Sequence, residues 1–114
     1  MKKSKQARAR EFSPEAREYI KERDGGCIFC KMGYPIEGTA GQPGYQIMHY
    51  IPRSQGGLGI PENGAVGCLI HHQMLDNGKH GRKMKNLFRT YLQKLYPGWD
   101  EKKLIYSKWD FKEV

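Results

Sequence analysis

The chain has 114 residues, with 20 Lys or Arg against 12 Asp or Glu, a net charge of +8 and a pI near 9.5. This length fits one domain with a modest core, to which a metal cross-link would add stability. The positive charge favours nucleic acid as a partner, although a merely soluble basic protein has the same balance. No apolar run is long enough for a membrane span, and no apolar segment follows the basic start, so we expect neither a membrane segment nor a secretory signal.

Residues 1–10 carry five Lys or Arg and, after Met1, no apolar residue larger than Ala. We therefore expect a basic flexible arm over residues 1–12, which either contacts DNA or serves as a solubilising tail, followed by one domain over 13–114. Ser13 and Pro14 are a typical helix start, and the predicted helix runs to about Arg23.

The remaining elements are predicted from turn residues and strand-forming runs. They are a loop over 31–44, a strand over 45–51, a loop over 53–63, a return strand over 65–68, helices over 69–76 and 82–96, and a short helix capped by Asp100. The aromatic residues of the last segment, Trp99, Trp109 and Phe111, are expected to pack onto the body of the domain.

Two short pairs have the spacing of metal ligands. Cys27 and Cys30 form C-x2-C, and Cys68 and His71 form C-x2-H. Together they satisfy a closed tetrahedral zinc site with no open position, which predicts a structural metal. The alternatives are three buried cysteines acting as small hydrophobic residues, or water or another residue in place of His71. Three cysteines cannot all pair, and this usage predicts a cytoplasmic, reducing location.

A second set of polar residues is interleaved with the first: His49, Asn63 and His72. Helix neighbours point about 100° apart, so His71 and His72 cannot easily serve one metal, whereas His72 and Asp76, four apart, share a side. A histidine is suited to proton transfer because its pKa lies near neutrality. Strand alternation turns Met48 away from the His49 face and into the core.

In this order, the segments ERDGGCIFC, HYIPRSQGG, ENGAVGC and LIHHQMLD resemble the HNH nuclease family over about residues 12–76. That family usually has Asp or His where Met48 stands, and often a second C-x2-C where this chain has C-x2-H. The resemblance implies an α+β domain built on a ββα-metal finger, with one structural zinc site and additional N- and C-terminal helices.

The resemblance also implies a metal-dependent DNA endonuclease. In it, His49 would be the general base, Asn63 would steady that histidine and the loop, and His72 with Asp76 would hold Mg²⁺, Mn²⁺ or Ni²⁺. Basic residues flank this unit and either contact phosphates or are solvated surface charges, namely Arg53, Lys79, Arg82 and Lys83. Packaging or mobile-element partners of a bacteriophage protein are implied, and a small-molecule substrate is not. A non-catalytic zinc module that binds nucleic acid and an RNA-directed nuclease remain as alternatives.

Overall fold

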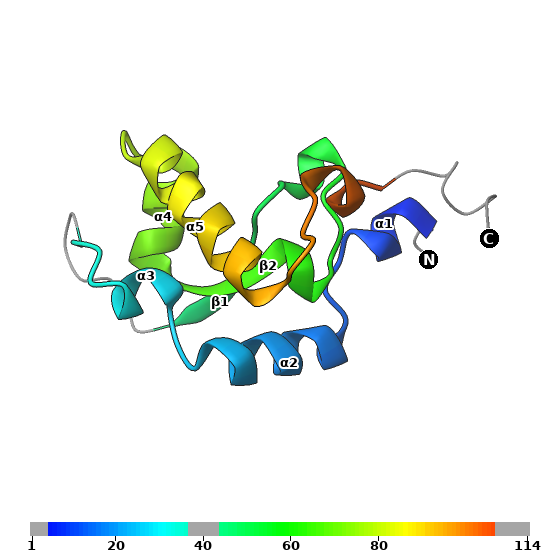
Figure 1. Cartoon of the computed structure of the whole chain (residues 1–114), viewed down its shortest axis with the longest axis horizontal. Coiled ribbons are helices and arrows are strands. Elements are labelled where there is room, and N and C mark those ends of the chain that lie inside the picture. The colour runs from blue at the N-terminus through cyan, green and yellow to red at the C-terminus, as the bar shows by residue number, and fades with distance from the viewer. Residues whose placement is uncertain (1–4, 37–43, 107–114) are drawn as a thin grey trace.

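Two antiparallel strands and the helix that follows them form the centre of the fold (Figure 1). The computed structural model describes residues 5–36 and 44–106. Strand β1 (Tyr45–His49) pairs with β2 (Gly64–Cys68), with Ile47 opposite Val66. The helices are α1 (Lys5–Ala9), α2 (Pro14–Asp24), α3 (Ile28–Lys31), α4 (Leu69–Asn77) and α5 (Gly81–Leu95), and short 3-10 turns cover Arg53–Gln55, Pro61–Asn63 and Glu101–Leu104. The α+β class is therefore confirmed.

Local signals set the ends of α2 where the sequence predicts them. The Ser13 hydroxyl accepts a hydrogen bond from the Ala16 amide at 3.1 Å, and Pro14 occupies the first turn, where its missing amide hydrogen costs nothing. At the other end Gly25 adopts the left-handed conformation, with φ 65°, and its amide returns to the Lys21 carbonyl. Helices α4 and α5 also lie within one residue of the predicted bounds.

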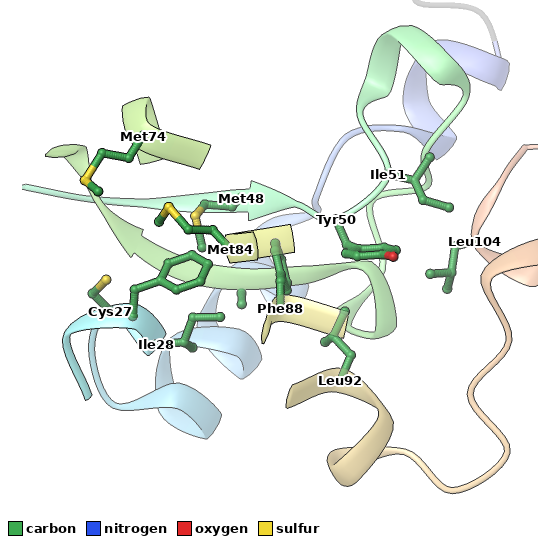
Figure 2. Close-up of a cluster of buried hydrophobic side chains, with 12 residues drawn as sticks. Cys27, Ile28, Met48, Tyr50, Ile51, Met74, Met84, Phe88, Leu92 and Leu104 are labelled. Atoms are coloured by element: carbon green, nitrogen blue, oxygen red, sulfur yellow. The ribbon is translucent and has the colours of Figure 1, made fainter. Parts of the chain in front are cut away.

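The sheet separates two apolar clusters. Met48 is fully buried in the larger one with Phe29, Met84 and Phe88, on the face covered by α3, α4 and α5 (Figure 2). A Cβ atom at Gly67, one strand over, would lie 2.3 Å from the Met48 sulfur, so this glycine makes room for the side chain. The core role predicted for Met48 is confirmed. The smaller cluster contains Phe12, Ile20 and Val66 on the α2 face.

A buried ion pair joins α2 to the sheet and to α5. The Asp24 carboxylate is 1% exposed and accepts hydrogen bonds from Arg23 at 2.7 Å, the Val66 amide at 2.8 Å and the Tyr91 hydroxyl at 2.5 Å. Arg23 also donates to the Gly64 carbonyl at 2.6 Å. Each polar group of the pair thus has a partner, as burial requires.

The expected flexible arm does not extend to residue 12. Residues 5–9 are helical, the Ala9 carbonyl accepts from the Gly59 amide at 2.9 Å, and Phe12 is only 6% exposed. Composition alone suggested disorder because the segment lacks large apolar residues before Phe12. Instead, its backbone groups find partners on the long loop after β1, which offsets the entropy lost on ordering.

The last described segment packs on the same loop. The Leu58 amide donates to the Leu104 carbonyl at 2.7 Å, and the Trp99 indole donates to the Glu62 carbonyl at 2.8 Å. The prediction for Trp99 is thereby confirmed, while Trp109 and Phe111 lie outside the described residues. Within the described part of the chain, no helix is both long enough and apolar enough to cross a bilayer.

Candidate metal centre and histidine site

Four potential metal ligands come together from two distant parts of the chain. The ligand atoms of Cys27, Cys30, Cys68 and His71 all lie within 4.8 Å of one another. The His71 Nδ1 atom is 3.5, 3.4 and 3.4 Å from the three sulfurs, and the Cys30 and Cys68 sulfurs are 3.9 Å apart. Zinc bonds in a tetrahedron predict edges of about 3.6 Å for sulfur to nitrogen and about 3.8 Å for sulfur to sulfur. The four groups are thus placed to bind one metal ion.

The same local geometry explains the spacing of both pairs. Cys27 caps α3 and Cys68 caps α4, and each sulfur accepts a hydrogen bond at 3.4 Å from the amide of the residue three positions on. That residue is Cys30 in the first pair and His71 in the second, so one helical turn brings its side chain beside the capping sulfur. Amide donors and the helix N-terminus both favour a thiolate.

His71 is oriented as a ligand by its second nitrogen. Its Nε2 atom lies 3.1 Å from the Tyr34 carbonyl oxygen, which can only accept, so Nε2 carries the proton and Nδ1 faces the sulfurs. His71 is fully buried and Cys27 is 2% exposed, but Cys30 is exposed. The alternative of three buried cysteines is therefore wrong. Partial burial and the thiols of Cys27 and Cys68 raise the pKa of Cys30 to about 12.

His49 is held as a neutral imidazole at the end of β1. Its Nε2 atom donates to the Arg10 carbonyl oxygen at 2.8 Å, which leaves Nδ1 with its lone pair. The Phe12 ring lies 4.4 Å from it, centroid to centroid. Burial lowers the pKa of His49, the Arg10 hydrogen bond opposes that shift, and the charges of Arg53, Arg17 and His72 add to it.

Asn63 holds the loop after β1 rather than His49 itself. Its fully buried amide accepts from the Ile51 amide at 2.8 Å and donates to the Leu58 carbonyl at 2.8 Å. Its own carbonyl accepts from the Tyr50 amide at 2.8 Å. The predicted support of the loop is confirmed. Direct support of His49 is not, because within the described residues the histidine's hydrogen-bond partner is the Arg10 carbonyl.

His72 and Asp76 form the second polar group, together with Gln46. The His72 Nδ1 atom donates to the Gln46 side-chain oxygen, which only accepts. The Nε2 atom of this ring lies 3.1 Å from an Asp76 carboxylate oxygen. Two acceptors at this distance need a proton or a cation between them. Adjacent ligands of an octahedral ion with bonds of about 2.1 Å would be about 3.0 Å apart.

The structure does not place His49 and His72 in contact. Alternation along β1 puts His49 with Ile47 on the α2 face and Gln46 with Met48 on the α4 face. The charge of His72 nevertheless lowers the pKa of His49, so the two side chains are close enough to interact electrostatically. The sequence did not lead us to Gln46, although it lies two positions from Met48 and therefore on the same face of β1. It also did not predict the contact of the Arg10 carbonyl, for which the sequence carries no signal.

The predicted phosphate-contacting residues divide into two groups. Arg53 is exposed, and its charge lowers the pKa of His49. Arg17, which was not predicted, lowers the pKa of His49 in the same way. Lys79 is exposed in the turn between α4 and α5, and Arg82 and Lys83 are exposed in the first turn of α5; this end of the two helices lies away from α1 in Figure 1.

Comparison with protein-family models, with curated proteins and with solved structures finds no match for this chain. The interpretation of the site therefore depends on its own residues.

Proposed function

We propose that this protein is a metal-dependent endonuclease of the HNH type, which hydrolyses phosphodiester bonds in DNA. The observation that carries the proposal is the state of His49: a neutral imidazole with Nε2 bonded and Nδ1 available. A general base needs that lone pair within reach of a water molecule. Arg53 and Arg17 beside it supply the positive charge that a phosphate group requires.

The scissile phosphate would lie at the outer edge of β1. In the described sheet β1 pairs with β2 alone, so its other edge carries no strand. His49 would face the phosphate from the α2 side of β1, and His72 with Asp76 from the α4 side. His49 would take a proton from the attacking water through Nδ1, while Arg53 would hold the phosphate in place.

His72 Nε2 and Asp76 Oδ2 fit a hard divalent cation such as Mg²⁺, Mn²⁺ or Ni²⁺, because an imidazole and a carboxylate 3.1 Å apart match neighbouring ligand positions. Such an ion supplies charge for the phosphorane and the departing oxygen when it is bound. The hydrogen bond to Gln46 fixes the orientation of the His72 ring, with Nε2 toward Asp76.

The four-ligand centre of Cys27, Cys30, Cys68 and His71 fits zinc. Three thiolates and one imidazole are a zinc ligand set, and every tetrahedral position is filled by the protein. We therefore assign zinc a structural role, in which it joins α3 to the start of α4. A reducing cytoplasm, as the cysteine usage predicts, would keep these thiols free to bind the metal.

A non-catalytic nucleic-acid-binding module is the second candidate, and Met48 favours it. The family usually places a metal ligand at that position, and here the side chain is fully buried in the core. Among the described residues, His72 and Asp76 are then the candidate ligands for the catalytic ion, and they lie on the other face of β1 from His49.

Incubation with supercoiled plasmid and Mg²⁺, Mn²⁺ or Ni²⁺ tests the proposal. We expect metal-dependent nicking or linearisation, products with 5′-phosphate ends, and strong loss of activity in His72→Ala that added metal partly restores. His80→Ala is the matched control, since His80 lies outside both sites. A labelled RNA of the same sequence tests the RNA alternative. Binding without cleavage under every metal would support the module instead.

A further inference from the structure

We propose that residues 9–12, here called the strap, are a built-in part of the catalytic site, in which the Arg10 carbonyl fixes the tautomer and orientation of His49. This inference rests on the proposed nuclease function for its consequence, but its structural basis is independent. It gives the basic N-terminal segment a positioning role rather than only a phosphate-binding one.

The strap is anchored on both sides of the Arg10 carbonyl. Before it, the Ala9 carbonyl accepts from the Gly59 amide at 2.9 Å. After it, the Phe12 side chain is buried against α2 and β2. The Arg10 guanidinium also donates to the Arg53 carbonyl at 2.9 Å, and Arg53 pairs with Glu11 at 3.4 Å. These contacts hold the carbonyl oxygen at one place relative to β1.

A carbonyl at this place decides which nitrogen of His49 carries the proton. It can only accept, so the tautomer with hydrogen on Nδ1 would leave two acceptors facing each other at 2.8 Å. The Phe12 ring, with its centroid 4.4 Å from that of His49, covers the imidazole and restricts its rotation. The lone pair on Nδ1 is thereby presented in one direction.

A neutral acceptor suits this task better than a carboxylate would. The charged groups that act on His49 are Arg53 and Arg17, together with the titratable His72, and all of them oppose protonation. A carboxylate at Nε2 would favour the imidazolium, which is useless as a base. The backbone carbonyl fixes the tautomer and favours the imidazolium less than a carboxylate would. The carboxylate of Glu11, which is in the strap, pairs with Arg53 instead.

One substitution displaces the strap without altering His49. A Cβ atom at Gly59 would lie 2.2 Å from the Glu11 carbonyl carbon and 2.5 Å from the Phe12 amide nitrogen, so Gly59→Ala must push this backbone away. Gly44→Ala is a matched control, because its Cβ would make an ordinary 3.5 Å contact with Leu69.

The test is ¹⁵N NMR of the histidine rings in the full chain, together with single-turnover cleavage of a duplex. In the parent protein and in Gly44→Ala we expect the Nε2–H tautomer of His49. In Gly59→Ala we expect mixed tautomers and a cleavage rate roughly tenfold to a hundredfold lower, as when other orienting groups are lost.

The proposal is overturned if His49 of the parent protein carries its proton on Nδ1, or if a folded Gly59→Ala keeps the parent tautomer. The first result is decisive even where Gly59→Ala does not fold. Failure of the nuclease function would look different: the expected tautomers would be found, but no protein, parent or variant, would cleave.

Discussion

Replacing His71 with Ala should unfold the protein under conditions where His72→Ala leaves it stable. The two histidines are neighbours in α4, but His71 is fully buried among three sulfurs and the other is not. A metal at this centre cross-links Cys30 to Cys68, which are 38 positions apart. Closing a loop of that length removes chain entropy from the unfolded state worth about 4 kcal/mol.

This stabilisation is a large fraction of the free energy of unfolding of the whole domain. A domain of this length has a free energy of unfolding of roughly 6–17 kcal/mol, so its loss should lower Tm on the order of 15 °C. Circular dichroism melting curves, recorded with zinc and after removal by a chelator, measure the shift, and elemental analysis confirms one zinc per chain beforehand. A melting temperature unchanged after verified removal of all metal would refute the structural role of the centre.

Three further predictions concern packing, pH and salt. Asp24→Ala leaves a buried guanidinium unpaired and should lower the free energy of unfolding in urea by about 3–5 kcal/mol, whereas a loss below about 1 kcal/mol would contradict the network described here. Burial lowers the pKa of His49 and the base acts when neutral, so the acidic limb of kcat/KM should lie below the ordinary pKa of a histidine. Arg53→Ala should move that limb upward, because the Arg53 charge also lowers this pKa; a limb that does not move would contradict His49 as the titrating base. Duplex affinity should fall steeply with salt, and the slope should flatten in Arg53→Ala more than in Lys83→Ala. A slope in Arg53→Ala equal to that of the parent protein would exclude a phosphate contact at Arg53.

Local signals predicted most elements of the fold. The Ser13 cap, the Gly25 stop and the two x2 spacings depend on one helical turn each, so they can be read without knowing the rest of the chain. The side chains of His71 and His72 separate for the same reason, since adjacent helix positions face different directions.

What the sequence did not reveal depends on long-range backbone contacts. The strap pairs one basic with one acidic residue, yet the contacts that fix it are made by backbone carbonyls: that of Ala9 accepts from the Gly59 amide and that of Arg10 from the His49 ring. Asn63 likewise supports the loop through bonds to backbone carbonyl and amide groups, whose positions cannot be predicted from residue types. The buried state of Asn63 also means that Asn63→Ala should reduce stability and not only activity.

The buried state of Met48 changes what can be learned at that position. Introducing Asp there would bury a charge in the core, so we expect unfolding and not the recovery of a metal ligand.

The central claim is that His49 activates water for attack on DNA. The most direct test measures cleavage rate and DNA affinity together for the parent protein and His49→Ala, at saturating divalent metal and with zinc content checked in both. The account predicts that His49→Ala binds the duplex as tightly as the parent, retains zinc, and loses cleavage by a factor of at least ~10². Cleavage by His49→Ala at the parent rate would contradict it.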